Sequence, residues 1–377
     1  MSLTALPTPA ALIDEASLMH NIHHMQQRLQ SLGVRLRPHV KTAKCLAVAQ
    51  RQRAAGAVGI TVSTLKEAEV FFEAGERDIH YAVGIAPGKL EAVRALRERG
   101  CDLIVLVDSL AAAQAVAEHG RVHSHRFAVM IEVDTDSHRA GIPPEDDLLV
   151  AVGRTLHEGG ATLRGVMTHA GASYECRSLE ALRAMAEQER SRCVRAATRL
   201  RAAGLPCPEV SVGSTPTALS AQHLQGVTEV RAGVYVFHDL VMLGLGVCRA
   251  DEIALSVLGT VIGHQAHKGW ALVDAGWMAM SRDLGIPGCA ANTGYGLVCD
   301  VHGTPIPGLL MASANQEHGI LAWPAGDTPA DIGAMFPVGT RLRVLPNHAC
   351  ATAAQFPAYA VLGQGGQVQI WPRFYGW

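Results

Sequence analysis

The sequence predicts an α/β protein that consists of a (β/α)8 barrel followed by a mainly β C-terminal domain. Short β-rich runs alternate with helical segments from Ala11 to about Tyr235. The connections between them are short, which implies parallel strands. About eight such units over roughly 225 residues fit a closed barrel, and an open doubly wound sheet is the alternative that the pattern leaves open.

The expected barrel elements follow one another along residues 11–245. Strands are expected at residues 11–14, 36–41, 59–62, 79–83, 103–107, 127–133, 163–168, 210–213 and 229–232. Helices are expected at residues 16–32, 44–55, 64–74, 87–99, 110–119, 146–158, 179–203 and 218–224. Thr64 and Glu67 have the spacing of a capping box, in which both side chains bind free amides at a helix start.

A change in the sequence pattern at residue 254 predicts the second domain. Apolar runs at residues 254–262, 270–273, 341–345 and 368–371 are separated by Gly, Pro and Asn instead of long helices. This pattern is typical of β structure. The predicted domains are therefore residues 11–245, and residues 246–377 together with 1–10.

Composition and charge exclude several classes of protein. The 377 residues carry a formal charge of −2 and show no basic run, so nucleic acid is not an expected partner. The first residues lack a secretory pattern and no apolar run is long enough to span a bilayer, which favours a cytoplasmic protein without a membrane partner. The nine cysteines include no CxxC pair, so a disulfide framework is not expected.

Lys41 is the first residue that could carry chemistry. It ends the run Arg37-Pro-His-Val-Lys41, at the end of an expected strand, and catalytic groups of barrels lie at such ends. A lysine near a second cation and partly removed from water is a candidate nucleophilic amine. An ordinary solvated lysine is the alternative.

Two small-residue turns are candidate phosphate sites. Gly213-Ser-Thr-Pro-Thr217 follows an expected strand and precedes a helix, and free amides at such a turn bind phosphate. A helix cap followed by Pro would explain the same residues without a ligand. A second turn at Ala232 and Gly233 follows the last strand, and loops after strands 7 and 8 often bind phosphate in barrels.

His348 and Cys350 form a His-x-Cys pair after the apolar run at residues 341–345. On an extended chain, side chains two positions apart point the same way. Imidazole and thiolate together suit zinc. A buried cysteine beside a structural histidine is the alternative.

Taken together, these residues resemble the fold-type III pyridoxal-phosphate (PLP) enzymes, in the branch of metal-dependent D-serine dehydratases and D-threonine aldolases. The resemblance covers nearly the whole chain. Its markers, in order, are Thr8-Pro-Ala10, Arg37-Pro-His-Val-Lys41, Val62-Ser-Thr-Leu-Lys-Glu-Ala-Glu69, Glu132-Val-Asp134 with Arg139, His169-Ala-Gly171 with Tyr174, Gly213-Ser-Thr215, Arg231-Ala-Gly-Val-Tyr235, Asp274-Ala-Gly276, Glu317-His-Gly319 and Pro346-Asn-His-Ala-Cys350.

The resemblance implies a role for each candidate. Lys41 would carry PLP as a Schiff base and act as base at Cα, with Arg139 near the phenolate oxygen and Tyr174 near the pyridine ring. A divalent ion, zinc or else Mn, Co or Mg, would bind His348 and Cys350, with His318 as a neighbour of unassigned role. The remaining cofactor-binding residues would be His169, Gly213, Ser214, Thr215, Gly233, Val234 and Tyr235.

The implied activity is dehydration of a D-3-hydroxy amino acid (D-threo-3-hydroxyaspartate, D-serine or D-threonine) to a 2-oxo acid and ammonia. Retro-aldol cleavage to glycine and an aldehyde is the alternative, and Cys350 departs from the Asp that is usual in aldolases of this group. Racemisation, a non-catalytic PLP carrier and a phosphate-sugar barrel without PLP are further alternatives. A homodimer is expected from the family.

Overall fold

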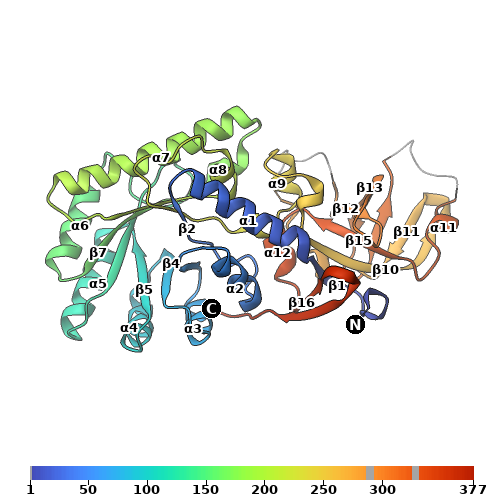
Figure 1. The fold of residues 1–377 in the computed structure, drawn as a ribbon, viewed down its shortest axis with the longest axis horizontal. Coiled ribbons are helices and arrows are strands. Elements are labelled where there is room, and N and C mark those ends of the chain that lie inside the picture. The colour runs from blue at the N-terminus through green and yellow to red at the C-terminus, as the bar shows by residue number, and fades with distance from the viewer. Residues whose placement is uncertain (1, 286–292, 325–330) are drawn as a thin grey trace. The chain divides into compact units, whose positions relative to one another are not determined.

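The computed structural model describes residues 2–285, 293–324 and 331–377 and divides the chain into two compact units (Figure 1). The first, called the barrel unit, comprises His24–Gly233 with Tyr375–Trp377. The second, called the β unit, comprises Met1–His23 and Val234–Phe374.

The barrel unit contains an eight-stranded parallel sheet with the order β2-β9-β8-β7-β6-β5-β4-β3. A parallel bridge between His39 and Thr61 joins its first and last strands, so the sheet closes on itself. The (β/α)8 prediction is thereby confirmed. The strands are β2 (Arg35–Leu36), β3 (Ile60–Val62), β4 (Asp78–Gly84), β5 (Asp102–Val107), β6 (Ala128–Glu132), β7 (Thr162–Met167), β8 (Glu209–Val212) and β9 (Glu229–Val230).

Helices lie outside this ring of strands (Figure 1). A strand covered on both faces needs a continuous apolar run, and all five residues of β6 are buried accordingly. Leu90, Val93 and Leu96 form the buried face of α4, at helical spacing. The helices are α2 (Leu46–Ala54), α3 (Leu65–Glu73), α4 (Leu90–Glu98), α5 (Leu110–Val122), α6 (Leu148–Glu158), α7 (Leu179–Ala202) and α8 (Thr215–Ser220).

The segment that leads to Lys41 differs from the prediction. The strand expected at residues 36–41 is only Arg35–Leu36, and Lys41 lies in a turn before α2 begins at Leu46. Pro38 has no amide proton to donate, but backbone hydrogen bonds continue past it, because His39 donates to the carbonyl of Ala232 and Val40 to that of Thr61. Lys41 is exposed and not partly buried as expected.

The β unit is built on a nine-stranded sheet with the order β11-β14-β13-β12-β15-β10-β1-β16-β17. All of its neighbours pair antiparallel except β1 and β16, and an additional pairing of β10 with β11 closes part of it into a barrel. The strands are β1 (Ala10–Asp14), β10 (Leu255–Gln265), β11 (Trp270–Val273), β12 (Gly296–Cys299), β13 (Pro305–Ala314), β14 (Gly319–Ala322), β15 (Arg341–Pro346), β16 (Ala358–Leu362) and β17 (Val368–Pro372).

The two units therefore differ from the predicted ranges 11–245 and 246–377 with 1–10. The first expected strand, β1, pairs with β10 and β16 and belongs to the β unit. Alternation of strands and helices marks where a strand lies in the sequence, but it does not identify the strand's partners.

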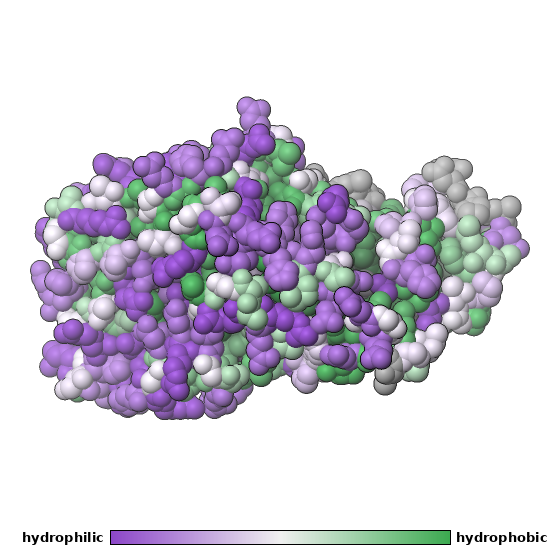
Figure 2. Space-filling model, viewed as in Figure 1, coloured by the Kyte–Doolittle hydropathy of each residue, from purple (hydrophilic) through white to green (hydrophobic). Residues whose placement is uncertain are grey.

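Hydrophilic side chains cover most of the visible outer surface of the barrel helices (Figure 2). No helix in the described ranges combines the length and apolar character needed to cross a bilayer.

Candidate cofactor and metal site

A group of polar side chains lies at the C-terminal ends of the barrel strands. His169 follows β7, and its Nδ1 lies 2.9 Å from the carbonyl oxygen of Gly213, which follows β8. The carbonyl can only accept, so Nδ1 carries the proton. The amide of Lys41 lies 3.5 Å from Nδ1 of His39. The predicted residues Lys41, His169 and Gly213 thus belong to one end of the barrel.

The charges in this group favour an anionic ligand. Burial, together with the charges of Lys41, Arg231 and Arg139, lowers the pKa of His169 to about 3 against the opposing effect of the hydrogen bond to the carbonyl of Gly213. Burial and then the charges of Lys41 and Arg231 lower the pKa of His39 well below its usual value. Both imidazoles are therefore neutral at neutral pH, and Lys41, Arg231 and Arg139 are the cations that an anionic ligand would meet.

Arg231 is a residue of this group to which the sequence assigned no role. Its guanidinium is buried, and Nε donates to Oγ of Ser211 at 2.9 Å. Nη2 donates to the backbone carbonyl of Thr168. Its position two residues before Gly233, in the turn after the last strand, was the available signal.

The first expected phosphate turn is tightly packed. Ser214 caps α8 by accepting from the amide of Thr217, which is the cap that the sequence offered as an alternative. Gly213 has φ +137°, and a Cβ there would lie 2.1 Å from the carbonyl oxygen of Arg231. Ser214 and Thr215 are buried. The turn therefore has room for backbone contacts but not for a larger residue at position 213.

The second turn is equally close to its neighbours. A Cβ on Gly233 would lie 3.1 Å from both the carbonyl oxygen of His39 and Oγ1 of Thr42. Val234 and Tyr235 follow in a buried 3-10 turn, Val234–Val236, which belongs to the β unit. A glycine at position 233 leaves space beside the segment that carries Lys41, which fits a ligand group approaching the backbone.

Glu189 organises this end of the barrel and was missed by the sequence analysis. It projects from α7, and its Oε1 accepts from the amides of Ala170 and Gly213, each at 3.0 Å. Burial raises its pKa. The available signal was an acid on the buried face of a helix, with the buried Ala186 and Cys193 one turn away on either side.

Arg139 and Tyr174 lie at the edge of the group. Nη2 of Arg139 is 3.5 Å from Oε1 of Glu132, and 59% of its side chain is exposed. Tyr174 lies in the 3-10 turn Gly171–Glu175, and its ring centroid is 6.3 Å from that of His169. The lysine, both arginines and the two small-residue turns together fit a ligand with a phosphate and a phenolate, as PLP has.

The predicted metal pair lies in the β unit. His348 is the N-cap of helix α12 (Ala349–Ala353), so Cys350 lies in the first helical turn. The extended conformation expected for the pair is therefore wrong, because the chain turns into a helix directly after His348. The two side chains nevertheless form a hydrogen bond with each other.

Two acids beside His348 were not found from the sequence. Nδ1 of His348 lies 2.6 Å from Oδ2 of Asp283. Asp239 is buried, caps helix α9 (Leu240–Gly244) and accepts from the amide of Ala349 at 2.9 Å. Asp283 is 65 residues from His348 and Asp239 is 110 residues from Ala349, and no sequence spacing announces such contacts.

The charges around His348 favour a cation. Burial lowers its pKa, but the hydrogen bonds and charges of Cys350, Asp239 and Asp283 outweigh burial and raise the pKa to about 10. A thiol, an imidazole and carboxylates are the donor set that divalent zinc binds, so the residues present fit such an ion. His318, expected as a neighbour, lies exposed in the turn between β13 and β14.

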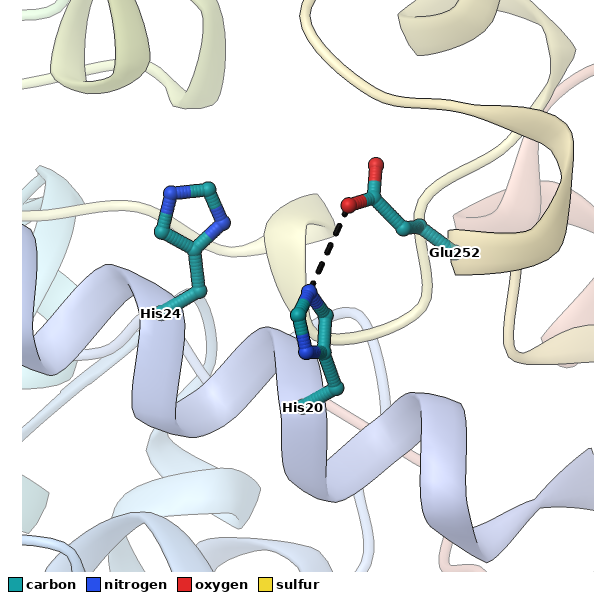
Figure 3. Close-up of side chains that lie close together, drawn as sticks. All are labelled: His20, His24 and Glu252. Carbon is teal, nitrogen blue, oxygen red and sulfur yellow. Dashed lines mark ion pairs between the residues drawn. The ribbon is translucent and has the colours of Figure 1, made fainter.

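A histidine and a glutamate also meet on the surface. His20 lies on α1 (Glu15–Ser31), and its Nε2 is 3.4 Å from Oε1 of Glu252, with His24 one turn further along the same helix (Figure 3). Arg249 also approaches Oε1 of Glu252, at 3.3 Å. Glu252 is largely buried, and its second oxygen accepts from the amide of Arg249 at 2.6 Å, so this carboxylate serves the local structure.

Comparison with known proteins gives the chain two domain assignments. Residues 13–240 match the alanine racemase N-terminal domain, and residues 254–362 match the putative serine dehydratase domain. The chain is 63% identical to D-threo-3-hydroxyaspartate dehydratase of Delftia sp. (strain HT23) over 100% of this chain and 99% of that protein. It is 28% identical to D-threonine aldolase of Arthrobacter sp over 98% of this chain and 92% of that protein.

Among solved structures, the metal-free form of a D-threo-3-hydroxyaspartate dehydratase with one cysteine replaced by alanine has a TM-score of 0.99. It is 62% identical, and the match covers 100% of both chains. A variant of that dehydratase with one histidine replaced by alanine gives the same TM-score. The chain therefore belongs to the fold-type III PLP family, in the branch that joins an alanine-racemase-like barrel to a serine dehydratase domain.

Proposed function

We propose that the chain is a PLP- and metal-dependent dehydratase that converts D-threo-3-hydroxyaspartate to a 2-oxo acid and ammonia. The observation that carries this proposal is the pair His348 and Cys350, whose side chains are hydrogen-bonded in an acidic setting. Full-length identity of 63% to a dehydratase of that specificity supports the choice of substrate. D-Serine and D-threonine are the smaller substrates of the same class.

The barrel end holds the cofactor. When bound, PLP supplies the electron sink for the carbanion at Cα. Lys41 would hold PLP covalently, and its amine would take the Cα proton of the substrate as general base. The neutral His39 and His169 next to Lys41 do not compete with it for a negative charge.

The other cofactor-binding residues divide between the two ends of PLP. Arg139 and Tyr174 lie toward the ring, with His169 beside Tyr174. The phosphate would bind at the two turns, through Gly213, Ser214, Thr215, Gly233, Val234 and Tyr235.

The β unit holds the ion. A divalent metal, zinc in the first place and Mn, Co or Mg otherwise, supplies Lewis acidity toward the β-hydroxyl, which is a poor leaving group. Asp283 holds Nδ1 of His348 and leaves Nε2 as the ligand nitrogen, which is the usual way a carboxylate orients a metal-binding imidazole. The relative's solved variants lack a histidine and a cysteine two positions apart, the same spacing as His348 and Cys350.

Aldol cleavage is the second candidate, because a D-threonine aldolase is 28% identical over nearly the whole chain. The two reactions differ in the bond that breaks at the same carbon: Cα–H for dehydration and Cα–Cβ for cleavage. Cys350 in place of the Asp usual in aldolases of this group favours dehydration.

A substrate panel tests the proposal. D-serine, D-threonine and both diastereomers of D-3-hydroxyaspartate are incubated with the protein, and 2-oxo acid is measured with zinc and after EDTA. We expect zinc-dependent 2-oxo acid, with the threo diastereomer preferred. Glycine with an aldehyde would establish the aldolase, and dehydration that persists without metal would overturn the role of His348 and Cys350. Sedimentation of the same protein tests the expected homodimer.

A further inference from the structure

A chain of buried polar residues lies behind Arg231 inside the barrel. Oγ of Ser211 accepts from Nε of Arg231 at 2.9 Å and donates to Oε1 of Glu229 at 2.7 Å. Nδ1 of His80 lies 3.4 Å from the same oxygen of Glu229, and its Nε2 lies 3.7 Å from Oε2 of Glu209. Ser211, Glu229 and His80 are fully buried.

Strand geometry places these residues in successive layers of the barrel interior. Ser211 and Glu229 are partners in the pairing of β8 with β9. Glu229 and Arg231 are two positions apart on one extended segment, so both point to the same side. Arg231 lies at the strand ends with Lys41 and His169, while Glu229 and His80 lie one layer deeper.

Stability alone does not explain why these polar residues are buried inside the barrel. Barrel interiors are ordinarily filled by branched apolar side chains. Removing charges from water costs several kcal/mol per ion, and apolar replacements of buried ion pairs are often neutral or stabilising. A charged interior directly behind one arginine of the cofactor end therefore points to an effect on that arginine.

We propose that Ser211, Glu229 and His80 are positioning residues that fix the Arg231 guanidinium in the cofactor pocket and thereby set the electrostatic environment of the cofactor. The proposal rests on the proposed function, since it assumes that PLP binds at Lys41. Ser211 and the carbonyl of Thr168 hold two different nitrogens of the guanidinium, which fixes both its position and its plane. Glu229 is the acid joined to Arg231 through Ser211, and its second oxygen accepts from Nε of the buried Arg37 at 2.9 Å, which holds the carboxylate in place.

The far end of the same network provides a matched control. Glu209 is paired with Arg164 at 2.6 Å, and Arg164 also reaches Asp102 at 3.0 Å. Among the described residues, Glu209 contacts Arg164 and His80 and not Arg231 or Ser211, so its loss should leave the arginine in place. Glu209→Gln keeps the size of the side chain and removes one charge from the network.

The experiment compares Ser211→Ala, His80→Gln and Glu209→Gln in the PLP-loaded protein. The visible absorbance of the cofactor–lysine Schiff base, the pH midpoint of that absorbance, kcat, KM and the melting temperature are measured. We expect Ser211→Ala to bind PLP, to move the pH midpoint by about one unit and to lower kcat about tenfold with little change in KM. His80→Gln should give a smaller shift, and Glu209→Gln should lower only the melting temperature.

Several results would overturn the proposal. A Ser211→Ala protein with the wild-type spectrum and midpoint would show that the chain is only structural, as would a Glu209→Gln protein that shifts as far as Ser211→Ala. Ser211→Cys, which keeps the volume and a weak donor, replaces Ser211→Ala if that variant does not fold, and an unshifted midpoint there also contradicts the proposal. Failure of the proposed function itself would be seen separately, as a wild-type protein that forms no Schiff base.

Discussion

The pKa values of two histidines, one in each unit, shift in opposite directions. At the barrel end the pKa of His169 falls to about 3, whereas in the β unit the pKa of His348 rises to about 10. Burial lowers the pKa in both places. The neighbours decide the outcome: Lys41, Arg231 and Arg139 surround one imidazole, and Cys350, Asp239 and Asp283 surround the other. One unit is thus prepared for an anion and the other for a cation.

Removing Lys41 should have the largest effect on this contrast. Lys41→Ala should abolish the visible absorbance of the cofactor–lysine Schiff base and reduce turnover by about a thousandfold or more, because both the covalent link and the base are lost. Absorbance spectroscopy of the purified protein measures it. Lys44→Ala is the matched control, since Lys44 is three residues away and pairs with Glu67 at 3.1 Å. A Schiff base that survives in Lys41→Ala would assign the link to another lysine.

The candidate metal site of the β unit can be disrupted without changing the barrel end. Cys350→Ala should abolish tight binding of zinc and reduce dehydration by about a hundredfold, while PLP stays bound at the barrel end. Metal content by mass spectrometry and the cofactor spectrum are measured on the same sample. Cys299→Ala controls for loss of a buried thiol elsewhere in the β unit. If PLP is lost together with zinc, the two units do not act independently.

The barrel end could be predicted from the sequence more completely than the acidic surroundings of His348 in the β unit. Strand–helix alternation predicted the barrel, and small-residue turns after strands predicted the positions of Gly213 and Gly233, because these signals are local. Asp239 and Asp283 reach His348 from distant parts of the chain, and no local pattern announces them. The partners of β1 were missed for the same reason.

The conformation of the metal pair could not be predicted from local spacing either. A His-x-Cys pair is compatible with a strand or with a helix start, and the apolar run at residues 341–345 favoured the strand. The carboxylate of Asp239, which binds the amide of Ala349, stabilises the helix start instead. Buried Glu189 and Arg231 are a different case, because an acid on an apolar helix face and an arginine at a strand end are visible in the sequence.

Arg282 is a cation within the acidic region of the β unit, so it could bind an anionic group of the substrate there. It precedes Asp283, the partner of His348, and its guanidinium lies 4.4 Å from the ring centroid of Trp277. We expect it to bind the second carboxylate of 3-hydroxyaspartate. Arg282→Ala should then lower kcat/KM for that substrate roughly tenfold or more, the effect of one charged hydrogen bond, and leave D-serine unaffected.

Steady-state kinetics with the two substrates checks this expectation. Arg139→Ala is the comparison, because Arg139 is a cation of the barrel unit assigned to the cofactor, and its loss should affect both substrates alike. An equal loss for D-serine in Arg282→Ala would mean that Arg282 does not distinguish the substrates.

The smallest expected effect tests the sign of the pKa shift at the barrel end. His169 has a folded pKa of about 3, below the value of about 6.5 for an unfolded histidine. Between these values the unfolded chain binds more protons, so the contribution of His169 to stability is present above pH 6.5 and is lost as pH falls toward 3.

His169→Gln cannot titrate, so in cofactor-free and metal-free protein its melting temperature should fall less between pH 6.5 and 5 than that of the wild type. His157→Gln, a change at a histidine in the last turn of α6, serves as control. Parallel melting curves for wild type and His169→Gln would mean that burial and the cations around His169 do not keep it neutral, and the contrast between the two units would then rest on His348 alone.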